Sequence, residues 1–550
     1  MYRILNVFCI AALVLSASSC KQNGAGANSI NTDSFIATVK QLSSDDFQGR
    51  KPFTAGEAKT TDYIQAKFKE MGLEPGNGNS YLQDVPLMNI AATASPTMKV
   101  EGAKGSFELK GYDDYAIWTD RADSIEILNN DDVVFAGYGV VAPEYGWNDY
   151  AGLDVKDKVV MVLVNDPGFY AKDSTLFKGQ TMTYYGRWTY KFEEAARQGA
   201  KACLIVHTQE GASYPFNVIQ NNWNTSRLVL DNGDKAEYKC PFTGWVTTAA
   251  AKKILEAAGM DSTLFAKADM KGFKGVPLNI KLSTLMSVIP TYNKSHNVIA
   301  KITGSKYPDE YIIYTAHWDH LGIGKADEKG DTIYNGALDN ASGSAALLEL
   351  ARTFKNMKEK PERTIVFLSV TAEEQGLLGS AYYAQYPVYP LEKTVANINM
   401  DGINIMGRTK DISVTGEGQN EVEDIYIKEA KARGMYVSPQ EHPEAGGYFR
   451  SDHFNFAKAG VPALSAHSGL DLEGKGKEEG KKLSDDYTAK HYHRPSDEYN
   501  AATWNKDGLM QDLQLYFLTG EKLAYSHTWP EWKEGSEFKA ARDKSKAMRK

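Results

Sequence analysis

Short apolar runs alternate with amphipathic stretches between about residue 290 and residue 530. Four of these runs are brief, mostly apolar and bounded by polar residues, which is typical of buried strands. The predicted strands are Tyr311–Ala316, Thr364–Val370, Val395–Met400 and Val461–Ala466. Apolar residues at helical spacing predict helices over Ser342–Phe354, Gly376–Gln385, Glu421–Ala432 and Gly508–Ala524. Strands that alternate with helices predict an α/β domain, with a central sheet covered by helices on both faces.

Two other patterns precede this region. Over residues 31–75 the apolar positions recur at helical spacing, as in Phe35, Val39 and Leu42, and Gly72 and Pro75 end the helical pattern. Residues 105–285 instead hold short β-branched runs bounded by turn residues, which predict a separate β-rich module. Examples are Val133–Phe135, Lys158–Val164 and Ala202–His207.

The first twenty residues have a third pattern. Ile4–Leu15 is a nearly continuous apolar run of 12 residues, and Arg3 is the only charge before Lys21. A helix of this length is too short to span a bilayer but suits the apolar core of a signal peptide. Small residues then lead to Cys20, as in a bacterial lipoprotein signal. We expect residues 1–19 to be removed and Cys20 to carry lipid, with a plain secretory signal as the alternative. The protein would then be exported to the cell envelope, in the periplasm or at the outer membrane.

Composition narrows the classes of function. At 550 residues the chain is long enough for two or three hydrophobic cores. With 42% hydrophobic and 24% charged residues it is an ordinary globular protein, and its net charge of −8 gives no support to nucleic-acid binding. Two cysteines, Cys203 and Cys240, remain beyond Cys20, and whether they pair is left open. Neither has C-x-x-C spacing, so a thiolate metal site is not expected.

Histidine and acidic residues gather where the predicted strands end. The clusters are His317-Trp318-Asp319-His320, Asp339-Asn340, Glu373-Glu374, Asp401 and His491-Tyr492-His493. Singly, each has an ordinary explanation, such as a surface His–Asp pair, a helix N-cap or an exposed acidic pair. Together they fall at the sheet edge where open α/β sheets place ligand sites. The mixture of nitrogen and oxygen donors suits zinc better than calcium or magnesium.

The adjacent pair Glu373 and Glu374 carries the most information. Two neighbouring carboxylates at the end of a buried strand repel each other and are costly to remove from water. A bound cation resolves that conflict. One carboxylate can then bind the metal while the other transfers protons.

Five motifs in this order resemble the co-catalytic zinc peptidase family, which includes bacterial leucyl aminopeptidases and glutamate carboxypeptidases. They are AHWDHLG, GALDNASG, TAEEQGLLGS, NINMDG and YHRPSD, between residues 316 and 497. The segment AGYGVVAPEYGWNDYAGLDVKDKVVMVL resembles the protease-associated domain often inserted in this family. The resemblance implies an α/β/α sandwich with a mixed central sheet. It divides the chain into residues 30–104 and 286–530 as two parts of the peptidase domain, 105–285 as the insert and 531–550 as a solvated tail.

The resemblance also implies roles for single residues. His317 and Asp401 would bind one zinc ion, Glu374 and His493 a second, and Asp339 would bridge them. Glu373 would be the general base, and Asp319 would orient His317. His491 is the alternative to His493, although the distance to Pro495 favours His493. A cis peptide bond is implied at Asp339–Asn340. Tyr448 would help to polarise the scissile carbonyl; the alternative is a packed aromatic residue beside Phe449 and Phe454.

The implied activity is that of an exopeptidase with two zinc ions, most simply an aminopeptidase acting on peptides. A carboxypeptidase or dipeptidase would need cationic groups for a substrate carboxylate, for which Arg187, Arg450 and Arg494 are candidates. A glutaminyl cyclase shares the fold but uses one zinc ion. A lipoprotein that only binds partners is the alternative from another class. The sequence leaves the preferred side chain and the oligomeric state open, and gives no membrane contact beyond Cys20.

Overall fold

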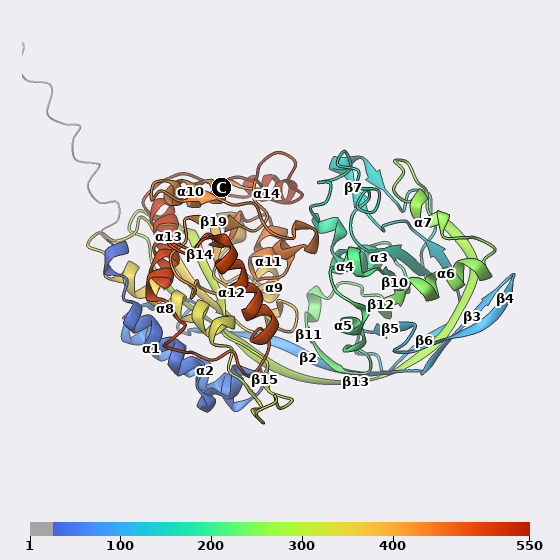
Figure 1. Cartoon of the computed structure of the whole chain (residues 1–550), viewed down its shortest axis with the longest axis horizontal. Helices are drawn as coiled ribbons and strands as arrows, with labels where there is room; N and C mark the ends of the chain where they lie inside the picture. The colour runs from blue at the N-terminus through green and yellow to red at the C-terminus, as the bar shows by residue number, and fades with distance from the viewer. Residues whose placement is uncertain (1–25, 550) are drawn as a thin grey trace, which may run out of the picture.

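The computed structural model of the chain describes residues 26–549 (Figure 1). The expected signal peptide, residues 1–19, and the expected lipid site at Cys20 lie outside the described residues. Among residues 26–549, no helix combines the length and the apolar character that crossing a bilayer requires.

The four predicted strands are neighbours in one mixed sheet. Strands β17 (Arg363–Val370), β14 (Tyr307–His317), β18 (Thr394–Asn399) and β21 (Ala463–Ser468) pair in this order and are all parallel. Antiparallel strands flank them, β13 (Val276–Ile302) beside β17 and β19 (Asp411–Val414) beside β21. Strand β20 (Tyr436–Val437) follows β19. The predicted mixed sheet is therefore confirmed, and the carboxyl ends of its parallel strands meet at one edge.

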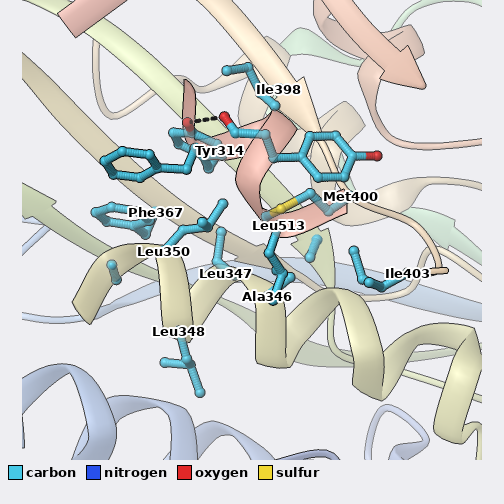
Figure 2. Close-up of a cluster of buried hydrophobic side chains, with 14 of the residues drawn as sticks. Tyr314, Ala346, Leu347, Leu348, Leu350, Phe367, Ile398, Met400, Ile403 and Leu513 are labelled. Carbon is cyan, nitrogen blue, oxygen red and sulfur yellow. Dashed lines mark hydrogen bonds between the residues drawn. The ribbon is translucent and has the colours of Figure 1, made fainter. Parts of the chain in front are cut away.

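Helices cover both faces of this sheet. One face carries α8 (Ser342–Lys355), α13 (Lys506–Ala524), α1 (Thr32–Leu42), α2 (Ala55–Glu70) and α10 (Glu421–Lys431). The other face carries α9 (Leu378–Gln385) and α11 (His453–Lys458). Figure 2 shows Leu347 and Leu350 of α8 pointing towards Phe367 and Tyr314 of the sheet, whereas Leu348 points away. This arrangement is the α/β/α sandwich that the sequence predicted, and we call it the α/β domain.

A second hydrophobic core lies in the region that the sequence marked as β-rich, which we call the insert. Its strands are β3 (Thr97–Gly102), β4 (Gly105–Lys110), β5 (Tyr115–Trp118), β6 (Ile125–Phe135), β9 (Val159–Leu163), β10 (Ala202–His207), β11 (Ser226–Leu230) and β12 (Phe242–Thr247). Its longer helices are α3 (Trp188–Arg197) and α6 (Thr248–Ala257). Cys203 and Cys240 are buried in this part of the chain as free thiols.

One strand joins the two bodies. Strand β13 is 27 residues long. Its first half pairs with β3 and β6 of the insert, and its last residues pair with β17 of the α/β domain. Strand β2 (Leu82–Ala94) runs beside its second half, and Figure 1 shows both strands passing under the two bodies. The expected boundary at residue 285 falls inside this continuous strand, so the proposed domain limits describe two cores rather than two separable pieces.

Two segments differ from the expectation. Residues 531–549 do not project into solvent as a tail, because Trp532, Phe538 and Arg542 are buried against the α/β domain. Arg542 donates hydrogen bonds to the carbonyl oxygens of Thr394 and Val395, which fixes helix α14 (Lys539–Lys546). Helix α12 (Lys477–Lys490) was not predicted, since only Gly480 of its residues is buried and its sequence shows no apolar stripe.

Candidate metal centre and active site

The sheet edge brings the separate clusters into one cleft. Strand β14 ends at His317, the loop after β17 carries Glu373 and Glu374, and Asp401 follows β18. Asp339 lies in the turn before α8 and His493 in the loop after α12. The structure therefore brings together all five residues that the sequence analysis named as metal ligands.

The carboxylate of Asp339 lies between the two imidazoles. Its Oδ1 is 3.4 Å from His317 Nε2, and its Oδ2 is 3.2 Å from His493 Nε2. Beyond them, Asp401 Oδ1 is 3.2 Å from His317 Nε2, and Glu374 Oε2 is 3.1 Å from His493 Nε2. The donor atoms thus form two groups that share Asp339. His491 is not part of either group, since its Nδ1 lies 2.9 Å from the carbonyl oxygen of Ser496.

His320 is a further donor that the sequence analysis did not assign. Within residues 26–549, two sets of donor atoms are close enough to hold a cation, His317 with Glu373 and Asp401, and His320 with Asp339 and Glu374. His320 Nδ1 lies 2.5 Å from Glu374 Oε1. The contact lacks hydrogen-bond geometry, so both ring nitrogens of His320 and Glu374 Oε1 are buried without a hydrogen-bond partner in the described part of the chain. The sequence held one signal, a second histidine in the motif that closes β14.

The electrostatics of the cluster reflect its density of acidic groups. Burial raises the pKa of Glu373 well above its usual value, and the negative charges of Asp401 and Glu374 raise it further. Burial alone would lower the pKa of His317, but the nearby carboxylates raise it well above the usual range. The pKa of His493 is raised to about 10 in spite of its burial, through its contacts with Asp339 and Glu374. A cation is therefore strongly favoured at this position.

Asp319 has a different contact pattern from the expected one. His317 Nδ1 lies 3.1 Å from the backbone oxygen of Asp319 but 3.7 Å from its carboxylate. The carboxylate instead accepts hydrogen bonds from the backbone N–H groups of Glu373, at 3.0 Å, and Glu374, at 3.4 Å. Burial raises the pKa of Asp319 to about 7. Asp319 thus orients His317 through its backbone and the two glutamates through its side chain.

Two further residues position the turn that carries Asp339. The carboxylate of Asp497 accepts hydrogen bonds from the N–H groups of Leu338 and Asp339, both at 3.1 Å. The buried guanidinium of Arg50 donates to backbone oxygens on both sides of the cleft, namely those of Leu42, Trp318, Asn335 and Gly336. The predicted cis peptide bond at Asp339–Asn340 is present. The N-terminal segment is therefore part of the machinery that shapes the cleft.

The cleft opens into a cavity of about 1360 Å³. Asp339, Glu373 and Asp401 lie on its wall, together with Arg450 and Tyr492, whose ring stacks on His493 at 3.9 Å between centroids. Helix α12 forms another part of the wall. The cavity is large enough for several residues of a peptide.

Tyr448 does not line this cavity. Its side chain is 3% exposed and packs edge-on against His453, 4.6 Å between centroids, with Phe449 and Phe538 nearby. This position favours the packed-aromatic alternative over a role in polarising a carbonyl. Tyr487 and Tyr492 are the tyrosines that line the cavity.

One family model matches the part of the chain that forms the cleft. The model of Peptidase family M28 matches residues 297–518. A "Probable zinc metalloprotease" of Pyrenophora teres f. teres is 42% identical over 104 residues, which are 19% of this chain and 22% of the relative. "Aminopeptidase NAALADL1" of Mus musculus is 38% identical over 112 residues, 20% of this chain and 13% of the relative. The chain thus spans about a fifth of the length of the curated relatives it matches.

Solved structures of similar fold include the aminopeptidase from Aneurinibacillus sp. strain AM-1. It is 20% identical, with a TM-score of 0.48, over 92% of this chain and 96% of that chain. The zinc aminopeptidase BSAP from Bacillus subtilis is 18% identical, with a TM-score of 0.42, over 93% and 99% of the two chains. The family match contains the four parallel strands and every donor residue of the cleft, so residues 297–518 of this chain are similar to peptidase family M28.

Proposed function

We propose that this protein is a zinc-dependent aminopeptidase that removes N-terminal residues from peptides and holds two zinc ions. The observation that carries the proposal is the carboxylate of Asp339, which lies between the imidazoles of His317 and His493, with Asp401 and Glu374 on either side. An arrangement of one shared carboxylate and two flanking pairs suits two adjacent cations.

The donor chemistry fits zinc. Each half of the cluster offers one imidazole nitrogen and carboxylate oxygens, whereas calcium and magnesium prefer oxygen ligands alone. His317 and Asp401 would hold one ion, Glu374 and His493 the other, and Asp339 both. The unpartnered Glu374 Oε1 and His320 nitrogens are further buried donors directed at the second position. The names of two relatives, a zinc metalloprotease and an aminopeptidase, support the same conclusion.

When bound, the ions would polarise the scissile carbonyl and lower the pKa of the attacking water. Glu373 lines the cavity and accepts the proton of that water, because burial makes its carboxylate a stronger base than usual. The water oxygen forms a bond to the acyl carbon as the C–N bond breaks, and Glu373 returns the proton to the leaving amine. The carboxylates of Glu373 and Asp401 also give the free N-terminal amine of a peptide a negative surface to bind.

Replacement of the base tests this assignment. Glu373→Gln keeps the shape of the side chain but cannot accept the proton, so we expect zinc to remain bound while turnover falls by about 10³-fold or more. Glu441→Gln is the matched control, since Glu441 lines the same cavity away from the donor cluster. Zinc content and hydrolysis of aminoacyl-nitroanilides measure both. Full activity of Glu373→Gln removes Glu373 from this role, and a wild-type protein without zinc removes the proposal.

A second candidate, a carboxypeptidase, is favoured by the position of Arg450. Arg450 lines the cavity, and within the described residues it forms no ion pair. Arg187 of the insert lies close enough to Arg450 for the two charges to interact. Burial lowers the pKa of Arg187 to about 10, and the charge of Arg450 contributes to this shift. Arg494 is exposed and does not line the cavity. Peptides with a blocked N-terminus and a free C-terminus distinguish the two activities, because only a carboxypeptidase would hydrolyse them.

We also propose that the chain is an exported lipoprotein and that the insert is a protease-associated domain. The apolar run before Cys20 supports the first proposal. Labelling of cells with a radioactive fatty acid should mark the wild-type protein but not Cys20→Ala. Equal labelling of both would contradict the lipid site.

A further inference from the structure

A chain of hydrogen bonds runs through the sheet and ends on Asp401. Asn397 Nδ2 donates to Thr315 Oγ1 at 3.1 Å, and Thr315 Oγ1 donates to Asn399 Oδ1 at 2.7 Å. Asn399 Nδ2 then donates to Ser451 Oγ, and Ser451 Oγ donates to Asp401 Oδ2, both at 2.7 Å. The four residues before Asp401 are all buried, and they come from β14, β18 and the loop before α11.

The direction of this chain is fixed by counting protons. The two hydroxyl groups carry one proton each, and the amide nitrogens can only donate. With the donors and acceptors assigned in this way, each of the four contacts contains one proton. If the amide of Asn399 were turned over, its oxygen would face Ser451, and the single Ser451 proton would have to serve both Asn399 and Asp401. One of the four short contacts would then have no proton, so every donor in the chain points towards Asp401.

This direction leaves the two oxygens of Asp401 in different surroundings. Oδ2 is engaged by Ser451, whereas Oδ1 faces His317 Nε2 at 3.2 Å. The equivalent carboxylate on the other side, Glu374, receives no hydroxyl proton of this kind, because among residues 26–549 its Oε1 faces His320 Nδ1 at 2.5 Å without hydrogen-bond geometry. The imidazole on the Asp401 side is also the more buried of the two. The side chain of His317 is 1% exposed and that of His493 is 36% exposed.

We propose that Ser451 is a positioning residue which holds Asp401 with Oδ1 directed at the cation shared with His317, and that this makes the His317–Asp401 position the tighter of the two cation positions. The inference rests on the proposed function, because it presupposes that cations bind in the cleft. Hydrogen bonds to metal-binding side chains commonly contribute 10–100-fold to metal affinity, because they hold the ligand in its bound orientation before the ion arrives. Polarisation along the chain adds to this effect.

Zinc titration against a chelating dye tests the proposal in two variants that retain one position each. In the His493→Ala protein, which keeps the His317–Asp401 position, we expect Ser451→Ala to raise the zinc dissociation constant by about 10–100-fold. In the His317→Ala protein the same substitution should have no effect. Ser451→Thr keeps the hydroxyl and should restore the affinity. Thr315→Val breaks the chain at a residue three hydrogen bonds from Asp401 without a change in shape, and should raise the dissociation constant by a smaller factor.

Ser468→Ala is the matched control. Ser468 Oγ donates at 2.5 Å to the buried carboxylate of Asp512, which is outside the donor cluster. This substitution removes the same kind of bond and should leave the zinc affinity unchanged. An unchanged affinity in Ser451→Ala, an equal loss in the His317→Ala protein, or an equal loss in Ser468→Ala would each overturn the positioning role alone. A wild-type protein that binds no zinc would overturn the role and the proposed function together.

Discussion

Two regions of this molecule bury a cluster of charged groups, and they satisfy those groups in different ways. The first is the cleft of the α/β domain. The second lies in the insert, where Asp149, Asp166 and Lys191 are all at most 1% exposed. Both clusters contain more than one buried carboxylate, which is costly without compensating partners.

In the insert the protein supplies every partner itself. Asp149 accepts hydrogen bonds from the N–H groups of Tyr138 and Val140 and from the indole of Trp147. Asp166 accepts from the N–H and the hydroxyl of Thr183. Lys191 donates to the carbonyl oxygen of Asn165 and its charge acts on both carboxylates. Such a cluster is complete without an added ion.

In the cleft the carboxylates face imidazole nitrogens and one another. Arg50 is near, but its guanidinium donates to four backbone oxygens and to no carboxylate of the described residues. Glu374 Oε1 and the nitrogens of His320 lack hydrogen-bond partners among residues 26–549. Buried carboxylates therefore indicate a metal site only where the protein supplies too few hydrogen-bond donors to satisfy them. These hydrogen-bond donors must be counted atom by atom.

The largest expected effect follows from removing the shared carboxylate. Asp339→Asn takes away the charge between His317 and His493, so we expect less than one zinc ion per chain and a loss of hydrolysis of about 10⁴-fold. Asp486→Asn, on the cavity wall but paired with Lys490 at the surface, is the control and should change neither. Metal analysis and peptide hydrolysis measure the two quantities. Retention of both zinc ions by Asp339→Asn would contradict the bridging position.

The next effect concerns the insert. Lys191→Met leaves two buried carboxylates without their cation, which should lower the free energy of unfolding by about 3–5 kcal/mol. Zinc content should not change. Lys158→Met is the control, because Lys158 pairs with the exposed Asp154 and its loss should cost less than about 1 kcal/mol. Urea denaturation followed by fluorescence gives both values. A loss of zinc in Lys191→Met would show that the two clusters are not independent.

Removal of zinc should have a smaller and local effect. At a free zinc concentration of about 100 times the dissociation constant, binding stabilises the protein by about 2.7 kcal/mol, and a chelator removes this contribution. Hydrogen exchange should show faster exchange at the ends of β14 and β18. Strands β9 and β10 of the insert should exchange at the same rate with and without the chelator. Uniformly faster exchange would contradict a local metal centre.

Much of the α/β domain could be predicted because its signals are local. Each parallel strand contains a mostly apolar run, and the donor residues His317, Glu373 and Asp401 lie at the end of such a run or within three residues of it. The cleft and the buried cluster of the insert differ in this respect as well. The buried cluster of the insert was not predicted, since Asp149, Asp166 and Lys191 lie in three segments without a common pattern.

The remainder depends on contacts that sequence spacing does not reveal. The acceptors of Arg50 include Trp318 and Gly336, which lie 268 and 286 positions away. The domain boundary expected at residue 285 falls inside strand β13, because no pattern in the sequence predicted one continuous strand over Val276–Ile302. His320 was not assigned in spite of its place in the same motif, because a strand continued from His317 by three residues would place it on the opposite face.

The smallest expected effect tests whether the insert cluster is as complete as its hydrogen bonds indicate. Burial raises the pKa of Asp166 to about 6, against about 3.9 in an unfolded chain. Between these values the folded protein holds a proton that the unfolded chain has released, so the free energy of unfolding should fall as the pH rises from about 4 to 6. In Asp166→Asn the amide oxygen can accept from the Thr183 N–H while the amide nitrogen donates to the Thr183 hydroxyl, so both contacts have a proton. The substitution removes the titrating proton and should flatten the slope by at most about 1.4 kcal/mol per pH unit.

Urea denaturation at pH 4.5, 5.5 and 6.5, with zinc present throughout, measures this slope for Asp166→Asn and the wild type. Asp173→Asn is the control, because the pKa of the exposed Asp173 is lowered by its hydrogen bonds to Thr175 and should leave the slope unaltered over this range. If Asp166→Asn leaves the slope as it is, Asp166 is ionised over the whole pH range. Its hydrogen-bond donors and Lys191 would then lower its pKa by more than burial raises it. The contrast with the cleft would then be sharper, since the insert would hold a full carboxylate charge with protein donors alone, which the cleft does not provide.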